Sequence, residues 1–123
     1  MTKFASVDEY LASLEPGTAT TVRSLIEAAV AVHQDLDVKL SWNVPQVHLG
    51  KHYVMGFGPA NRHISIAPWS KDVMTMFADH IAAYDPTDNM LRVPTDWTVD
   101  TQLIADLVRA RLSELSGISR PTA

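Results

Sequence analysis

Apolar residues recur with two different spacings along the chain, one typical of helices and one typical of strands. Near the N-terminus and again in the last third, apolar residues recur at three- and four-residue spacing, which is typical of amphipathic helices. Between residues 38 and 67 the period falls to two, because apolar and polar residues alternate as they do in half-buried strands. The pattern therefore predicts a central sheet with helices before and after it.

Two helices are expected before the sheet. Ser6 followed by Glu9 is a capping-box pattern, which indicates the start of a first helix. Pro16-Gly17 is expected to end that helix, since both residues interrupt helical periodicity. A second helix, with an apolar stripe on one face, is predicted from about Ala19 to His33.

A four-stranded meander is expected next. Its strands are predicted over residues 38–42, 47–49, 53–57 and 63–67. Asn43-Val44-Pro45 is expected to interrupt the extended structure after the first strand, because Pro45 has no amide to donate. Gly50-Lys51 has the glycine first, as a two-residue type II′ hairpin loop requires.

The last third of the chain returns to helical periodicity. Ser70 is the expected cap of a third helix. A short strand follows over residues 90–93, and a final helix capped by Thr98 or Asp100 is expected to end at Gly117. The buried stripe of the third helix is predicted to contain Val73, Met76, Phe77, Ile81 and Tyr84.

The predicted order of elements is ααββββαβα. Hairpin-joined strands flanked by helices indicate an α+β fold, a two-layer sandwich in which helices pack against an antiparallel sheet of about five strands. The 123 residues fit a single domain over 1–123, with its core at about 6–115 and a frayed tail over 117–123.

Composition and charge exclude several classes of protein. The net charge is −4, whereas a nucleic-acid binder carries a basic field. The chain has no cysteine, which excludes disulfides, thiolate metal sites and cysteine nucleophiles. No apolar run approaches the roughly 20 residues of a membrane helix, and the N-terminus lacks the apolar segment of a signal peptide. We therefore expect a cytoplasmic protein with no membrane or nucleic-acid partner.

Three histidines fall on the predicted sheet, and imidazoles on facing strands are good ligands for a divalent metal. They are His48, His52 and His63. If Gly50-Lys51 is the hairpin loop, Leu49 pairs with His52, and His48 then points to the opposite face. A joint site for His48 and His52 would need a bulge or a longer loop.

Carboxylates offer a second kind of metal site. Asp8 and Glu9 lie in the predicted first helix, and Asp35 and Asp37 lie on a segment where strand geometry would hold them roughly 7 Å apart. Carboxylate oxygens suit hard cations, including iron. The alternative is structural, because aspartates favour the caps and turns that are expected at these positions.

A ligand pocket is the third possibility. Arg92 lies inside a short apolar strand, where it would face solvent, pair with an aspartate or hold an anion. Trp42 and Trp69 end predicted elements, where they would either cover the core or line a pocket. Trp42, His63 and Arg92 are therefore the candidate residues at its edge. No serine lies in a G-x-S-x-G motif and no titratable pair is obliged to meet, so the sequence favours a non-enzymatic protein.

A series of short motifs resembles the YdhG-like domain family over about residues 6–115. In order, they are S-V-D-E-Y-L-A-S-L at 6–14, S-W-N-V-P at 41–45, H-I-S-I-A-P at 63–68 and L-R-V-P at 91–94. These are small bacterial proteins largely of unknown function, some described as frataxin-like intracellular iron chaperones. The resemblance implies a two-layer α+β fold broadly like frataxin, and iron as a bound metal. A frataxin-type acidic ridge has few counterparts in the first helix, which offers only Asp8, Glu9 and Glu15.

Two functions follow as hypotheses. The first is a non-enzymatic domain that binds iron weakly through the carboxylates Asp8, Glu9, Asp35 and Asp37. The alternative is a small-ligand or protein-binding module with a pocket or sheet face near Trp42, His63 and Arg92. Pairing of two copies through an apolar sheet face is a further arrangement that the sequence allows.

Overall fold

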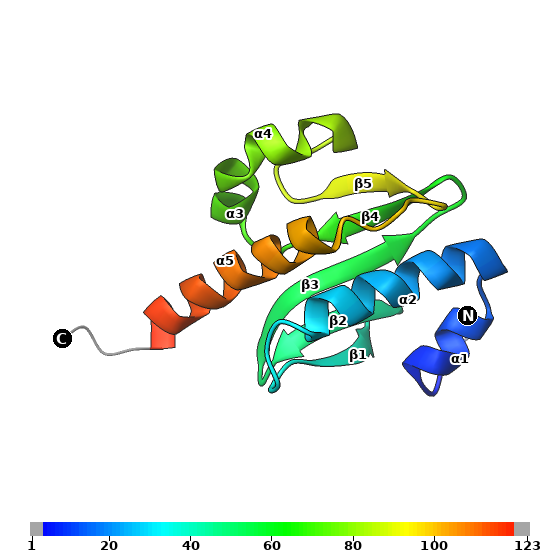
Figure 1. Cartoon of the computed structure of the whole chain (residues 1–123). Helices are drawn as coiled ribbons and strands as arrows, with labels where there is room; N and C mark the ends of the chain where they lie inside the picture. Colours follow the sequence, from blue (N-terminus) through cyan, green and yellow to red (C-terminus); the bar gives the residue numbers. More distant parts are fainter. Residues whose placement is uncertain (1–3, 120–123) are drawn as a thin grey trace.

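A single five-stranded antiparallel sheet, in the order β1-β2-β3-β4-β5, forms the centre of the molecule (Figure 1). The computed structural model describes residues 4–119. The strands are β1 (Asp37–Ser41), β2 (Val44–Leu49), β3 (His52–Pro59), β4 (His63–Ala67) and β5 (Leu91–Pro94). The helices are α1 (Val7–Ala12), α2 (Pro16–Val30), α3 (Lys71–Met76), α4 (Ala78–Ile81) and α5 (Thr101–Ser119), with a 3-10 turn η1 (Ala82–Tyr84) after α4. The predicted α+β sandwich is confirmed.

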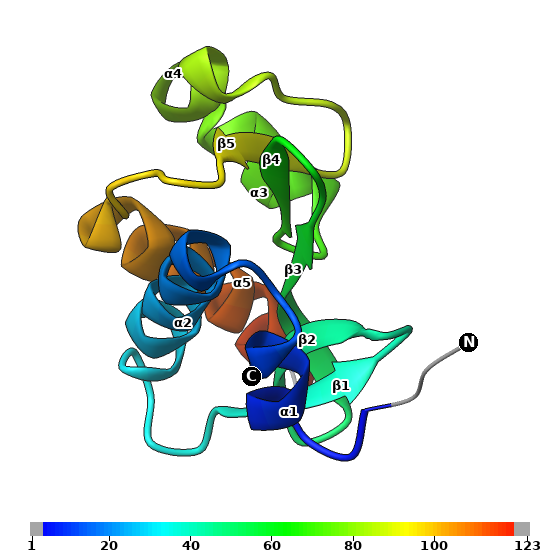
Figure 2. The same ribbon diagram turned by 90° about the vertical axis from the view of Figure 1, so that its right-hand side faces the viewer.

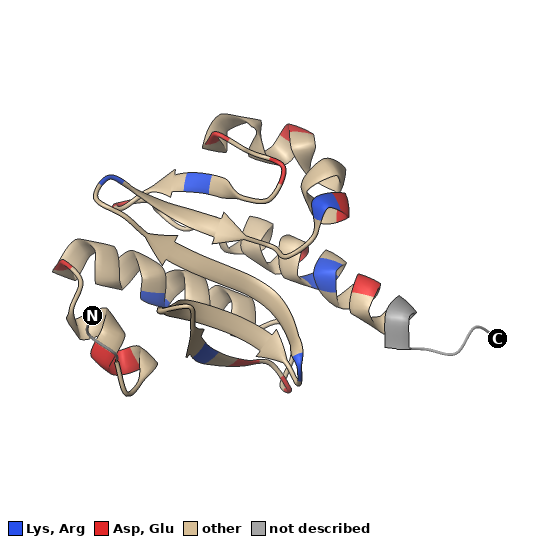
Figure 3. Ribbon diagram, turned by 180° about the vertical axis from the view of Figure 1, so that it is seen from behind, with Lys and Arg blue, Asp and Glu red and all other residues tan. Residues whose placement is uncertain are grey.

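The two long helices cover one face of the sheet. α2 and α5 pack against each other and against β3, and Figure 2 shows both on the same side of the strands. α1 packs on α2 and β1, and α3 packs on α5. Within residues 4–119 no helix crosses the opposite face of the sheet, which is turned to the viewer in Figure 3. We call the helix-covered face the inner face and the opposite one the outer face.

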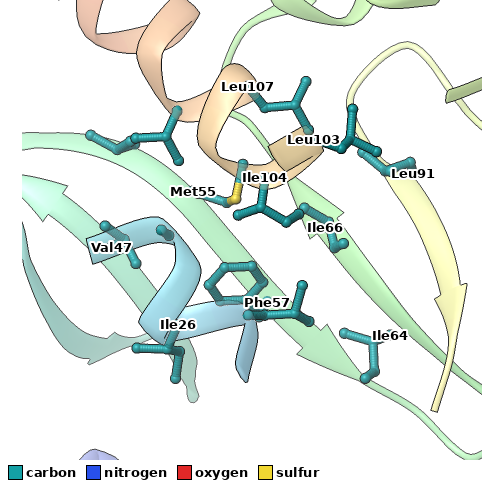
Figure 4. Close-up of a cluster of buried hydrophobic side chains, with 14 of the residues drawn as sticks. Ile26, Val47, Met55, Phe57, Ile64, Ile66, Leu91, Leu103, Ile104 and Leu107 are labelled. Atoms are coloured by element: carbon teal, nitrogen blue, oxygen red, sulfur yellow. The ribbon is translucent and has the colours of Figure 1, made fainter. Parts of the chain in front are cut away.

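The core lies between the inner face and the two long helices (Figure 4). Met55, Phe57, Ile64 and Ile66 are fully buried there, and Ile104 of α5 packs among them. Burial of a large apolar side chain contributes about 1.5–3 kcal/mol, so these residues are the main source of stability. In the described part of the chain, no helix is long and apolar enough to cross a membrane.

The helix starts follow ordinary capping rules, with one correction. The Glu9 amide donates to Ser6 Oγ over 3.0 Å, as predicted for the start of α1. α1, however, already ends at Ala12 and Pro16 is the first residue of α2, so the expectation that Pro16-Gly17 ends the first helix is wrong. A proline fits this position because the first helical amide has no partner within the helix. α2 therefore begins earlier than predicted and ends at Val30.

The first hairpin also differs from its prediction. Trp42-Asn43 forms a two-residue loop, and β2 begins directly after it, at Val44. Pro45 does not interrupt the sheet but pairs with Leu40. The closing pair of such a loop is the hydrogen-bonded one, so the next pair, which contains Pro45, needs no amide between β1 and β2.

The second hairpin is confirmed. Leu49 pairs with His52 around the Gly50-Lys51 loop, and Gly50 has a φ of 57°, as the first position of a type II′ turn requires. His48 is consequently on the opposite face from His52. A bulge follows between Val47 and His48, where β3 contains one extra residue.

The third predicted helix is broken into α3, α4 and η1. Ser70 caps α3 as expected, since the Val73 amide donates to its Oγ over 3.1 Å. Met76 was predicted to be buried, yet its side chain is 64% exposed. Met74, which is 5% exposed, packs in the core beside Val73 instead.

The last elements are close to their predictions. β5 begins at Leu91, and Asp100 caps α5 by accepting from the Leu103 amide over 3.1 Å. α5 does not end at Gly117 but continues to Ser119. Residues 120–123, the remainder of the predicted frayed tail, lie outside the described residues.

Candidate functional site

A groove of about 490 Å³ lies on the outer face. Its lining includes Gly56 and Gly58 of β3 and Ser65 and Ala67 of β4. Strand alternation turns these small residues away from the core, while the large residues between them point inward. The outer face is therefore hollow in the middle of the sheet because its side chains are small.

Three aromatic rings form a platform beside this groove. The ring centroids of Trp42 and Tyr53 are 5.0 Å apart, those of Tyr53 and Trp69 are 5.0 Å apart, and those of the two tryptophans are 5.5 Å apart. Trp42 is 67% exposed and Trp69 is 39% exposed, and both line the groove. Because the rings contact one another, they present a continuous surface and leave no space between them for a ligand. We call this cluster of Trp42, Tyr53 and Trp69 the aromatic platform.

Both tryptophans of the platform have a left-handed backbone. The φ of Trp42 is 53° and that of Trp69 is 59°. Bulky residues rarely adopt this region, which costs on the order of 1 kcal/mol or more for each. Trp42 occupies a hairpin position that glycine or asparagine normally fills. Packing in the core therefore does not explain why two exposed tryptophans stand in a strained backbone.

The orientation of Trp69 depends on a close approach between two strands. Trp69 Nε1 donates to Gln46 Oε1 over 2.9 Å, and Gln46 is only 4% exposed. The amide of Gln46 lies against Gly56, where an added Cβ would collide with it. Gly56 is therefore required for the side chain that holds Trp69.

A polar network anchors the platform from the other layer. Arg111 of α5 donates from Nε to the carbonyl oxygen of Tyr53 over 3.0 Å and pairs through a guanidinium nitrogen with Glu114 at 3.3 Å. Glu114 in turn accepts from the Ser70 hydroxyl over 2.6 Å. The Arg111 and Glu114 side chains are only 15% and 24% exposed, so water screens them weakly. The network thus ties the backbone at Tyr53 and next to Trp69 to the final helix.

Of the candidate pocket residues, Trp42 lines the groove and the other two lie beside it. Arg92 pairs with Ser65 across β4 and β5, so it shares the outer face. Its guanidinium is 3.0 Å from Asp85, which is the aspartate pairing considered from the sequence. His63 is on the same face, at the end of β4, opposite Pro94. Neither Arg92 nor His63 is part of the groove lining.

The candidate metal ligands remain dispersed. Asp8 pairs with Arg23 at 3.6 Å, and Asp35 lies 3.9 Å from His33. Asp37 accepts from the Val38 amide over 2.8 Å. Within residues 4–119, no three histidine, aspartate or glutamate side chains lie together as ligands for one ion. Asp8, Glu9, Asp35 and Asp37 therefore do not form one preassembled centre.

Several residues of the groove were not foreseen. Gln46, Gly56, Gly58 and Ser65 had no assigned role, although the G-F-G spacing placed both glycines on one face of a strand. That spacing was the available signal. The contact between Gln46 and Gly56 depended on strand register, which the sequence did not define.

Comparison with known proteins supports an α+β domain of the YdhG type. YdhG of Bacillus subtilis, a protein of the DUF1801 family, superposes with a TM-score of 0.82 and 23% identity, over 91% of this chain and 92% of that one. An uncharacterised conserved protein from Lactobacillus casei superposes with a TM-score of 0.58 and 28% identity, over 97% of this chain and 98% of that one. The resemblance to the YdhG-like family is thereby confirmed at the level of the fold.

Sequence comparison finds a curated protein whose name states a function. The chain is 22% identical over 113 residues to the intracellular iron chaperone frataxin of Bacillus subtilis strain 168, covering 90% of this chain and 92% of that protein. No protein-family model matches the chain. The chain is thus similar in sequence to a protein that is named as an iron chaperone.

Proposed function

We propose that the chain is a non-enzymatic binding module whose outer-face groove takes a small, flat and largely apolar ligand. The observation that carries this proposal is the pair of exposed tryptophans, Trp42 and Trp69, held in a strained backbone at the edge of the groove. A volume of about 490 Å³ falls within the usual range of small-molecule sites. Exposed apolar surface beside such a groove is typical of a ligand site.

The lining suits a planar molecule. Gly58 leaves the sheet backbone partly accessible, whereas Gly56 is buried beneath the Gln46 amide, and the platform offers the faces of its rings for stacking. Ser65 and Asn89 add a hydroxyl and an amide to the lining, and such groups orient a ligand by hydrogen bonds. His63 and Arg92, beside the groove on the same face, remain candidates for contact with a larger ligand.

Titration with 2-naphthamide, a neutral flat probe, tests this proposal. We expect amide chemical shifts in two-dimensional NMR spectra to change at Gly56, Gly58, Ser65 and Ala67 as the probe is added. Trp42→Ala should weaken binding at least about fivefold, since aromatic contacts contribute about 0.5–1.5 kcal/mol beyond area burial. Shifts scattered over the surface, or unchanged binding by the variant, would contradict the proposal.

Met76→Ala is a matched control for this experiment. Met76 is also a large exposed apolar residue, at 64%, but it lies outside the groove lining. Its truncation removes exposed apolar surface without touching the platform. Binding of 2-naphthamide should therefore be unchanged.

Iron binding is a second candidate function, supported by the name of the Bacillus subtilis relative. Its ligands would be the surface carboxylates Asp8, Glu9, Asp35 and Asp37. A hollow of about 670 Å³ between α1, α2 and β1 is lined by Asp8 and Glu27 but also by Arg23 and Lys39. Arg23 pairs there with Asp8 at 3.6 Å, and its charge opposes a positive ion, so this candidate is the weaker one on geometry.

Anaerobic titration with ferrous iron tests the second candidate. Binding below about millimolar that is lost in Asp8→Asn or Asp35→Asn would support it, because carboxylate oxygens are the ligands that a hard cation needs. The absence of binding in that range would remove it. Trp42→Ala should bind iron as the unaltered protein does, which separates the two candidate functions.

A further inference from the structure

The charge of the groove lining has one sign. Lys71 is its charged residue, and no acidic side chain lines the groove among the residues that the structure describes. This is unexpected in a chain whose net charge is −4. Lys71 is exposed, and within residues 4–119 it enters no ion pair. Its ammonium is therefore available to a ligand.

Two more cations lie on the same face of the sheet. Lys39 of β1 is 5.5 Å from the centroid of the Tyr53 ring, on the aromatic platform. Arg92 of β5 is opposite Ser65, a residue of the groove lining, and Figure 3 shows its strand at the edge of the outer face. The acids nearest in the chain are Asp72, beside Lys71, and Asp88, beside Asn89, while Asp85 is held by Arg92. None of these three acids is part of the lining.

The arrangement of the rings disfavours a cationic ligand. Aromatic cages bind cations by surrounding them with separate ring faces. The three rings of the platform are in contact with one another, and Lys39 already lies over the Tyr53 ring. A cation in the groove would also be repelled by Lys71.

We infer that the ligand of the groove is an aromatic anion, with its ring against Trp42 and Trp69 and its negative group toward Lys71. The inference rests on the proposed function and adds the chemical class of the ligand. A carboxylate or sulfonate near an ammonium forms a charge-assisted hydrogen bond, which is about twice as strong as a neutral one. The ring contributes the apolar contact, and Lys71 selects the charge.

A matched set of probes tests the inference. 2-Naphthoate and 2-naphthamide have the same ring and nearly the same shape, but only the first is charged, and 2-naphthylmethylammonium has the opposite charge. We expect 2-naphthoate to bind about 5- to 10-fold more tightly than 2-naphthamide in low salt, as measured by NMR titration. The ammonium probe should bind least tightly of the three.

Lys71→Met separates the charge from the ring. The variant keeps much of the side chain but removes the ammonium. Its affinity for 2-naphthamide should therefore be retained, and its affinity for 2-naphthoate should fall to about the same value. Lys51→Met is the control, because Lys51 is an exposed lysine in the β2–β3 loop and lies outside the groove lining. It should keep the full preference.

The outcomes distinguish the inference from the proposed function. Equal binding of 2-naphthoate and 2-naphthamide at the groove, or a preference that persists in Lys71→Met, would overturn the inference and leave the proposed function standing. Tightest binding of the ammonium probe would overturn the sign of the inferred charge. Failure of all three probes to reach the groove would overturn both proposals. This outcome includes a dimer, detected by light scattering, whose interface covers the groove.

Discussion

The two faces of the sheet are made by the same strands and have opposite characters. On the inner face, β3 and β4 contribute Met55, Phe57, Ile64 and Ile66, all fully buried. On the outer face, the residues of those strands that alternate with them in the groove lining are small, and large aromatic side chains lie at the rim in Trp42 and Trp69. Because side chains alternate along a strand, one stretch of sequence supplies both the core and the groove.

The difference between the faces is energetic as well as chemical. The inner face gains free energy from burial, whereas the outer face keeps two tryptophans exposed with φ values of 53° and 59°. Residues that lower stability without packing in the core are expected at functional sites. The inner face therefore supplies the core of the fold, and the outer face is the one on which we propose that a ligand binds.

The largest effect on stability is expected on the inner face. Ile64→Ala should lower the free energy of unfolding by about 2–5 kcal/mol, since it leaves a cavity at a fully buried position. Ile64→Val, which removes one methylene, should cost about 0.5–1.5 kcal/mol. Urea denaturation measures both. If Ile64→Ala lowered the free energy of unfolding by less than Ile64→Val does, the inner face would not contribute the stability assigned to it.

A smaller effect is expected where the final helix meets the platform. Arg111→Met should cost about 1–3 kcal/mol, because Glu114 then keeps its charge in a partly buried position without its partner. It should also weaken binding of 2-naphthamide, since Tyr53 loses its anchor. Thermal unfolding and NMR titration measure the two effects.

Arg109→Met is the matched control for Arg111. Arg109 pairs with Asp106 at a similar spacing on the same helix, but the two side chains are 59% and 41% exposed. A surface pair contributes only about 0–1 kcal/mol. Equal costs for the two arginine variants would contradict a role of Arg111 in anchoring the platform.

A third effect tests the close approach on the outer face. Gly56→Ala should displace the amide of Gln46 and break its hydrogen bond with Trp69, at a cost of about 1 kcal/mol. In a Gln46→Ala background the same change should cost less, and this double-mutant cycle measures the coupling. A Cβ at Gly58 would meet only the Ser65 Cβ at 4.0 Å, so Gly58→Ala should leave stability nearly unchanged. Additive costs in the cycle would exclude the proposed contact.

The smallest effect isolates the backbone strain of Trp42. Trp42→Asn and Trp42→Ala both remove the indole, so both should lose binding of 2-naphthamide. Trp42→Asn should nevertheless be more stable than Trp42→Ala by up to about 1 kcal/mol, because asparagine tolerates a left-handed backbone. Comparison of the two melting temperatures decides the point, and identical values would mean that the loop relaxes on substitution.

Much of the fold follows from local rules that a sequence displays. The capping at Ser6 and Ser70 and the hairpin at Gly50-Lys51 depend on neighbouring residues, and all three predictions are confirmed. Local signals were wrong at Pro16 and Pro45. A proline is tolerated wherever its missing amide would have no partner, and only the surrounding hydrogen bonds decide whether it ends an element or lies inside one.

The candidate site was predicted only in part for a related reason. Trp42 was identified as a pocket residue because a large amphipathic side chain at the end of an element often has this role, and it lines the groove. His63 and Arg92 share its face but not its groove, because His63 lies two residues before Ser65 on β4 and Arg92 lies one strand away, on β5. The role of Arg111 required α5 to lie over β3, a contact between distant parts of the chain.

The sequence by itself determined the alternation that separates core from surface, the caps of α1, α3 and α5, and the net charge. Only the tertiary structure decided that Trp42 and Trp69, from two different loops, contact each other at a groove that is also lined by Gly58 and Lys71. The physical reason is that alternation is a property of each strand alone, whereas the groove depends on the register between strands and on helices packed across them.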